Sequence, residues 1–292
     1  MNVTPADLAG VTTAAGARSR VDPMAWLAVP GAAYLVIAFA LPLALLLATS
    51  VRGDAGLTLE GYARFFGDPF SVTVMLNTLR AAGLTTLICL VAGYPVAFAL
   101  ARARGVLQGA LLVALIVPLS VGVVVKAFAW TILLRSDGVV NRSLVGLGLI
   151  ESPVRLIFTE VGLVLGAVNV FLPFMVLPIF SVVKLMDPRL DEAAATLGSG
   201  PAHRFVHVTL PLTMPGVIAG VAFVFSMSVS MYVIPTLLMG DRFKTLSILI
   251  ARSFLFMRDR SLGSTMSVTL LAIAVVVVVA SAVLTRRWQP AR

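Results

Sequence analysis

Residues 261–285 read SLGSTMSVTLLAIAVVVVVASAVLT, a run of 25 residues without a charged side chain. About 20 apolar residues are enough for a helix to cross the ~30 Å hydrocarbon core of a bilayer, because each residue adds about 1.5 Å. Five more charge-free stretches of at least 21 residues occur, at 23–51, 81–101, 105–125, 161–183 and 205–240. The sequence therefore predicts an all-α, polytopic membrane protein with six transmembrane helices.

The composition agrees with this fold class. Of the 292 residues, 59% are apolar and 12% are charged, and the mean hydropathy is +1.03, whereas a soluble domain has about 25% charged residues. Lys and Arg number 22 against 13 Asp and Glu, but no run of basic residues exceeds two. The expected partner of this positive charge is membrane lipid and not nucleic acid. The single cysteine, Cys89, cannot form a disulfide within the chain.

The first span could be a cleaved signal peptide, and the limits of the third and fifth helices do not follow from the charge-free stretches alone. The first has 29 charge-free residues, more than the about 7–15 of a signal-peptide core, so an uncleaved span is favoured over a cleaved signal. We expect the third helix to continue through Lys126 to about Leu134, with the lysine stem reaching the lipid headgroups. We expect the fifth helix to begin near Thr213, because Pro211 and Pro215 are tolerated in a first turn but not deep inside a helix.

The charges do not orient the chain. The face that holds both termini carries ten Lys and Arg, and the opposite face also carries ten, while Arg80 and Lys126 lie in or near spans. The positive-inside rule therefore gives a tie.

The sequence lacks the residues that ion-coupled transport, ATP binding and metal binding require. The predicted spans contain no carboxylate, which disfavours a proton- or sodium-coupled carrier. No lysine follows a glycine, so the chain has no phosphate-binding loop for ATP. His203 and His207 are four residues apart, but no third ligand accompanies them, and we predict no metal site. The chain is thus not expected to be an enzyme or to hold a cofactor; a secondary carrier or a membrane enzyme is the alternative class.

A hydrophilic loop separates the fourth and fifth spans. Residues 187–211 read DPRLDEAAATLGSGPAHRFVHVTLP, which predicts two short helices around a turn. Pro188 suits an early position of the first helix, and Asp191 and Glu192 suit its positive end. Gly198 can end that helix in a left-handed conformation, and Pro201 can begin the second.

This loop resembles the signature of binding-protein-dependent ABC importer permeases, which is Glu-Ala-Ala, three residues, Gly, nine residues, Ile, one residue, Leu-Pro. The matching positions are Glu192, Ala193, Ala194, Gly198, Leu210 and Pro211. Val208 takes the place of the Ile, which is the one departure. Segments such as Tyr94-Pro95-Val96-Ala97, Ala129-Trp130 and Leu172-Pro173-Phe174 resemble the spermidine/putrescine-type branch, which also contains permeases for iron, opines and phosphonates.

The resemblance implies a type I ABC importer permease fold in the bacterial inner membrane, with both termini in the cytoplasm. Residues 1–25 and 289–292 would be cytoplasmic tails, and 26–288 a single permease domain with its cytoplasmic coupling loop at 184–212. The implied partners are a dimer of ATP-binding subunits, which would hold the ATP and Mg, a second permease subunit, and an external solute-binding protein. The second permease is commonly a homologous but distinct chain in this branch, and a second copy of this chain is the alternative. The implied substrate is a polyamine such as putrescine or spermidine; an opine, a phosphonate, an amino-acid-like solute or ferric iron is the alternative.

The path for the solute is expected along the fourth and fifth spans, which the family places near the dimer axis. The candidate path-lining residues are Trp130, Asn169, Ser226, Ser230 and Tyr232. Each could instead form a hydrogen bond to a neighbouring helix. Glu160 and Asp241 at outer span ends could assist a cation, whereas Lys126 would favour an anion.

Overall fold

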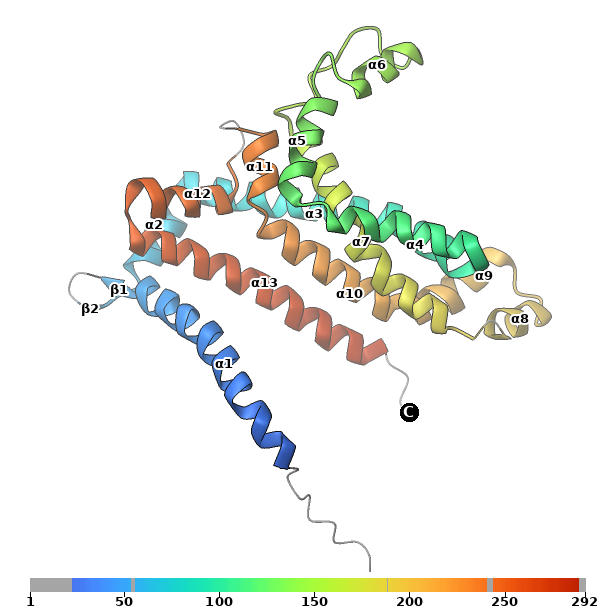
Figure 1. The fold of residues 1–292 in the computed structure, drawn as a ribbon, viewed down its shortest axis with the longest axis horizontal. Coiled ribbons are helices and arrows are strands. Elements are labelled where there is room, and N and C mark those ends of the chain that lie inside the picture. The colour runs from blue at the N-terminus through green and yellow to red at the C-terminus, as the bar shows by residue number, and fades with distance from the viewer. Residues whose placement is uncertain (1–22, 54–55, 188, 241–243, 289–292) are drawn as a thin grey trace, which may run out of the picture. The chain divides into compact units, whose positions relative to one another are not determined.

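The structure is a computed structural model that describes residues 23–53, 56–187, 189–240 and 244–288 (Figure 1). It divides into two compact units, residues 1–48 and 49–292, which are described separately. The first unit contains most of helix α1 (Pro23–Ser50). The apolar side chains of α1 from Val29 to Leu45 are exposed, as expected for a helix in lipid. The expected tails lie mostly outside the described residues.

The second unit is built almost entirely of helices. A short ribbon of β1 (Arg52–Gly53) and β2 (Gly56–Leu57) precedes them. The helices are α2 (Glu60–Gly67), α3 (Pro69–Arg102), α4 (Gly105–Ser120), α5 (Val123–Leu133), α6 (Val139–Gly146), α7 (Glu160–Leu185), α8 (Arg189–Thr196), α9 (Pro201–Arg204), α10 (Leu210–Val229), α11 (Val233–Leu238), α12 (Leu246–Arg252) and α13 (Arg260–Trp288), with π-helical turns at Phe205–Thr209 and Ser253–Met257.

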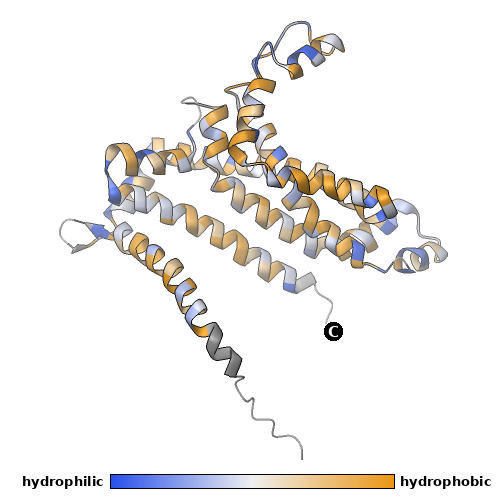
Figure 2. Ribbon diagram, viewed as in Figure 1, coloured by the Kyte–Doolittle hydropathy of each residue, from blue (hydrophilic) through white to orange (hydrophobic). Residues whose placement is uncertain are grey.

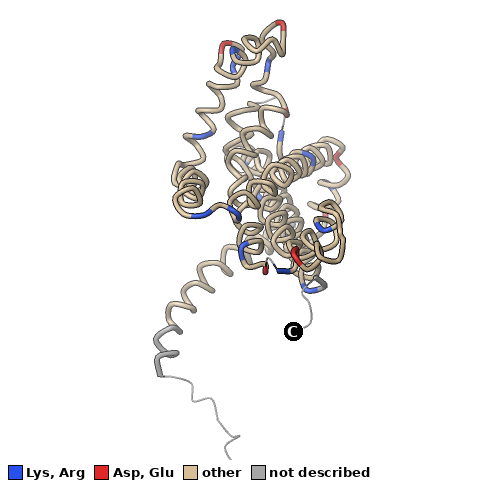
Figure 3. Tube along the Cα trace, turned by 90° about the vertical axis from the view of Figure 1, so that its right-hand side faces the viewer, with Lys and Arg blue, Asp and Glu red and all other residues tan. Residues whose placement is uncertain are grey.

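The predicted spans are present. Among the described residues, five helices are long and apolar enough to cross a membrane, and a bent pair makes up to a sixth. Apolar residues dominate these helices in Figure 2, and Figure 3 shows that most charged residues lie in the connections and near helix ends. The all-α membrane fold class is confirmed.

The third span differs from the expected continuous helix. It consists of α4 and α5, which meet at 99° across Val121 and Gly122. Pro118 lies in the last turn of α4 and lacks the N–H that would continue the hydrogen-bond ladder. Gly122 then has an extended conformation before α5 begins. The prediction of one helix to about Leu134 was therefore wrong in shape, although α5 does end at Leu133.

The fifth span begins earlier than Thr213. The helix continues without interruption from Pro201 to Val229, a length of 29 residues. A π-helical turn at Phe205–Thr209 makes this possible. The Leu210 N–H donates to the Phe205 carbonyl, five residues back, so the main-chain hydrogen-bond pattern shifts by one residue. The shift comes just before Pro211, which has no N–H to donate. The inference from the prolines failed since it considered α-helical hydrogen bonding alone.

The second span is longer than its charge-free stretch. Asp68 starts α3 because its carboxylate accepts hydrogen bonds from the Ser71 hydroxyl, at 2.6 Å, and from the Phe70 and Ser71 N–H groups. These bonds, that of the Ser71 hydroxyl above all, hold the pKa of the Asp68 carboxyl below its ordinary value. Arg80 lies inside α3, where its Nε is 3.0 Å from Oε1 of Glu160, the first residue of α7.

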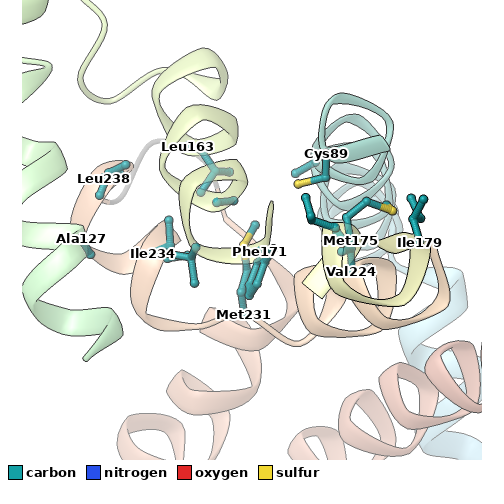
Figure 4. Close-up of a cluster of buried hydrophobic side chains, with 14 of the residues drawn as sticks. Cys89, Ala127, Leu163, Phe171, Met175, Ile179, Val224, Met231, Ile234 and Leu238 are labelled. Carbon is teal, nitrogen blue, oxygen red and sulfur yellow. The ribbon is translucent and has the colours of Figure 1, made fainter. Parts of the chain in front are cut away.

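Helices α3, α7 and α10 pack together and form the core. Small residues allow their close approach: a Cβ on Gly216 would lie 2.8 Å from the Pro178 carbonyl oxygen, and one on Gly220 would lie 2.8 Å from the Met175 sulfur. Figure 4 shows Met175 of α7 beside Cys89 of α3. The same core places the middle of α7 against the end of α10, which is where the cavity described below is found.

Candidate functional site

The predicted loop forms a helical hairpin in which α8 and α9 are joined by a turn. Its turn is a Schellman motif: the Gly198 N–H donates to the Ala195 carbonyl at 3.0 Å, and the Ser199 N–H donates to the Ala194 carbonyl at 3.2 Å. Gly198 has φ +80°, which confirms the predicted left-handed end of the first helix. Pro201 begins the second helix, as predicted, and that helix runs directly into the fifth span. Pro188 lies outside the described residues.

An apolar stripe lies exposed on α8 and the turn. Leu190 is 47% exposed and Leu197 is 87% exposed, and Ala193 between them is exposed as well. These positions are three and four residues apart and share one face of the helix. Glu192 is also exposed. The described part of the chain does not cover this stripe, and an exposed apolar face of a helix is the form that docks into an apolar groove of another protein.

The hairpin is tied together by one side chain. Arg204 of α9 donates from Nη1 to the Asp191 carboxylate, at 3.2 Å, and to the Asp191 main-chain carbonyl, at 3.4 Å. This bond joins α8 to the start of the fifth span.

The fifth span in turn contacts α3. The Phe205 ring lies edge-on to the Tyr94 ring with centroids 5.9 Å apart, and the Tyr94 hydroxyl forms a 2.9 Å hydrogen bond with the Thr213 hydroxyl. A displacement of α8 would therefore be transmitted to both α10 and α3.

The predicted signature residues separate into two groups. Glu192, Ala193 and Gly198 are exposed on the hairpin, whereas Leu210 and Pro211 are half-buried at the base of α10. The second group directly follows the π-helical turn at Phe205–Thr209, which lets the helix pass its proline. His203 and His207 stack with ring centroids 3.9 Å apart, and the described residues contain no group of three metal-ligating side chains.

A second feature is a cavity of about 410 Å³ at the place where two spans are broken. One break is the α4–α5 bend, and the other is the turn at Ser230–Tyr232 between α10 and α11. The middle of α7 closes the cavity with Val170, Phe171 and Phe174. Figure 4 shows Phe171 beside Met231, which also lines it. Broken membrane helices that surround a cavity are typical of transporter binding sites.

The structure brings only two of the five predicted path residues to this cavity. Ser230 and Tyr232 line it. Trp130 packs into the hydrophobic core instead, and the Ser226 hydroxyl is buried without a hydrogen-bond partner among the described residues. Asn169 is exposed on the face of α7 that also carries Leu165. These three do not meet at the site.

Lys126 also lines the cavity, although we expected its stem to reach toward lipid headgroups. The residue is 9% exposed and lies in the first turn of α5. The expectation was wrong because the α4–α5 bend turns this face of α5 toward α7 and α11. The aromatic lining by Phe171 and Phe174 was missed; the signal available was Pro118 followed closely by Gly122, which marks a break in an apolar run.

The connection between α5 and α7 is held by one buried amide. Asn141 is 0% exposed; its Nδ2 donates to the carbonyls of Arg135 and Val154, and its Oδ1 accepts from the Val154 N–H. Glu160, considered as a cation ligand, is engaged by Arg80. Asp241 lies outside the described residues.

Comparison with known proteins agrees with this arrangement. Residues 90–290 match the family described as binding-protein-dependent transport system inner membrane component. The spermidine/putrescine transport system permease protein PotB of Escherichia coli (strain K12) is 35% identical over 244 residues, which are 81% of this chain and 88% of that protein. PotB of Haemophilus influenzae is 34% identical over 214 residues, 73% of this chain and 74% of that protein.

Two solved structures share the fold. A bacterial ABC transporter involved in the import of the acidic polysaccharide alginate aligns with a TM-score of 0.75 at 17% identity, over 90% of this chain and 95% of the other. The MetNI methionine ABC transporter aligns with a TM-score of 0.56 at 16% identity, over 75% of this chain and 96% of the other. The chain therefore belongs to the family of binding-protein-dependent inner membrane transport components, as an ABC importer permease of the spermidine/putrescine-type branch.

Proposed function

We propose that this chain forms half of the membrane path of an ATP-driven polyamine importer, with putrescine or spermidine as the solute. The observation that carries the substrate class is 35% identity over 81% of the chain to a spermidine/putrescine permease. The chain itself is the transport subunit, and the ATPase site with its ATP and Mg belongs to a partner. A dimer of ATP-binding subunits, a second and homologous permease chain and an external solute-binding protein complete the assembly.

The α8–α9 hairpin is the proposed docking element for the ATP-binding subunit. Its support is the exposed stripe of Leu190, Ala193 and Leu197, which a groove on the partner would cover. Glu192 at the positive end of α8, and Ala194 within it, complete the proposed contact with the ATPase. Gly198 fixes the angle of the turn. When the ATPase dimer closes, α8 moves, and the Asp191–Arg204 bond carries that movement into the fifth span.

The cavity at the two helix breaks is the proposed section of the solute path. Ser230 and Tyr232 remain the candidate lining residues, joined by Phe171 and Phe174. Aromatic faces attract ammonium groups, which suits a polyamine. Trp130, Asn169 and Ser226 would contribute only if the second permease chain or a movement of the helices exposed them to the path.

The substrate is tested by binding calorimetry of the cognate external protein against polyamines, opines, phosphonates and ferric iron. We expect putrescine or spermidine to bind and the others not to bind. If no polyamine binds, the substrate class is wrong, while membership of the permease family stands.

The sidedness is a separate proposal: both termini and the 184–212 loop lie in the cytoplasm. After Cys89 is replaced, a cysteine at Ser199 should react with an impermeant thiol reagent only from the cytoplasmic side, and one at Gly240 only from outside. Reaction of the Ser199 cysteine from outside in intact cells would disprove the orientation, because no ATP-binding subunit could then reach the hairpin.

A further inference from the structure

The cavity contains a positive charge that neither the hairpin nor a polyamine substrate explains. Lys126 is 9% exposed and lines the cavity together with Ser230 and Tyr232. None of the described residues that line this cavity is a carboxylate, and none forms an ion pair with Lys126. Charges inside a membrane are costly and are retained when they serve a function.

The position within the helix makes this charge more costly still. Lys126 lies in the first turn of α5, where its N–H donates to the carbonyl of Gly122, the residue that precedes the helix. The exposed N–H groups of a helix N-terminus carry partial positive charge, which repels an ammonium group. Packing also does not require a lysine here, since most residues that line the same cavity are apolar, among them Val123, Val170 and Ile234. A methionine of similar length would fill the same space without the free-energy cost of burying a charge.

We propose that Lys126 is a charge barrier that keeps small inorganic cations out of the cavity between transport cycles. The proposal rests on the assignment of the cavity to the solute path. A solute path for cations conducts inorganic ions whenever it is continuous across the membrane, because the membrane potential draws K⁺ and Na⁺ inward, and a fixed positive charge in the path lowers that leak. Fixed positive groups exclude cations and protons from narrow membrane pores in this way.

The barrier is strong only while the cavity is narrow. For a monovalent cation about 6 Å from the ammonium group, an effective dielectric constant of about 20 lowers its occupancy roughly 100-fold, whereas in bulk water the reduction is about threefold. When ATP drives the helices apart at the two breaks, water fills the widened cavity and the repulsion falls toward the second value. The repulsion acts on every ammonium group of a polyamine, so a polyamine delivered by the external protein passes the lysine only in this widened state, in the step that ATP drives.

The test measures passive ⁸⁶Rb⁺ influx into liposomes that contain the assembled importer, without ATP and with an imposed inside-negative potential. Lys126→Met removes the charge and keeps the length of the side chain, and Lys126→Arg is the matched control that keeps the charge. We expect influx through Lys126→Met at least tenfold above wild type, and influx through Lys126→Arg within twofold of it. Size-exclusion chromatography confirms that each complex is assembled.

A second measurement separates this proposal from the path assignment. In a chain without Cys89, a cysteine at Ser230 should react with a water-soluble thiol reagent if the cavity belongs to the path. If that cysteine reacts and Lys126→Met leaks no more than wild type, the barrier is disproved and the path stands. If that cysteine does not react in any state of the transport cycle, both the path and the barrier are disproved.

Discussion

Replacement of Gly198 by valine should uncouple the hairpin from transport without disturbing the membrane helices. Gly198 has φ +80°, a conformation that costs an L-residue about 1–2 kcal/mol and a β-branched one more. A Cβ at this position would meet no atom within 4 Å, so the cost comes from the backbone alone. If the valine left this conformation, the two Schellman hydrogen bonds to Ala194 and Ala195 would be lost, at about 0.5–1.5 kcal/mol each.

Either route costs the hairpin about 1–3 kcal/mol, which corresponds to a roughly 5- to 150-fold smaller population of the docked geometry. Gly200 supplies the matched control: it too has open space around a Cβ, but its φ of −66° and ψ of 159° suit valine. Gly200 is the N-cap of α9 but has no side-chain cap to lose, so the main difference between Gly198→Val and Gly200→Val is the left-handed backbone that only the first must adopt. Gly198→Asn should fall between them, because asparagine tolerates the left-handed region.

The assay is ATP-driven uptake of labelled polyamine by the assembled importer in liposomes, together with co-purification of the ATP-binding subunit. We expect uptake by Gly198→Val to fall at least fivefold and uptake by Gly200→Val to stay near wild type. Equal uptake by the two valine variants would refute the argument, since it would show that the angle of this turn does not matter for coupling.

Three further changes test other contacts. Asp191→Asn and Arg204→Gln should each weaken the partly exposed Asp191–Arg204 ion pair, at a cost of about 0.5–1 kcal/mol, and uptake should fall in each variant. The double variant should transport no less than either single variant, because both changes remove the same interaction, whereas changes at independent sites would add. Gly216→Leu should lower the melting temperature in detergent, with a cost of at least about 1–3 kcal/mol because its Cβ would collide with backbone atoms of α7, while Gly83→Leu, in open space on α3, should not. Asn141→Leu should leave polar backbone groups of the α5–α7 connection unpaired, at about 1–3 kcal/mol each. Proteolysis of that connection should accelerate, and unchanged cleavage would show that the amide is dispensable.

Local features of this protein were predictable because each depends on a few neighbouring residues. The spans α7 and α13 follow from charge-free runs, since any charge in hydrocarbon is costly. The Schellman turn follows from Gly198, because few other residues accept a positive φ. The hairpin residues were therefore identified in sequence, and the structure adds that Leu190 and Leu197 are the exposed part of it.

The arrangement of the spans depended on contacts between residues far apart in sequence. Pro118 and Gly122 mark a break in the apolar run of the third span, but they do not give the size or direction of the bend. The 99° angle accompanies the packing of α5 against α7 and α11. That bend turns Lys126 from the lipid side into the cavity.

Contacts between residues far apart in sequence also decide which polar residues of the predicted path reach the cavity. Serine, asparagine and tryptophan in a span can face lipid, a neighbouring helix or a cavity, and hydropathy has the same value in all three places. Tertiary packing placed Ser230 and Tyr232 at the helix breaks, buried the Ser226 hydroxyl and left Asn169 on an open face of α7. The sequence by itself determined that the chain crosses the membrane and where its hairpin turns, because hydrocarbon and backbone conformation act on each segment alone. Only the tertiary structure decided which side chains meet, because the rotation of each helix is set by the helices that pack against it.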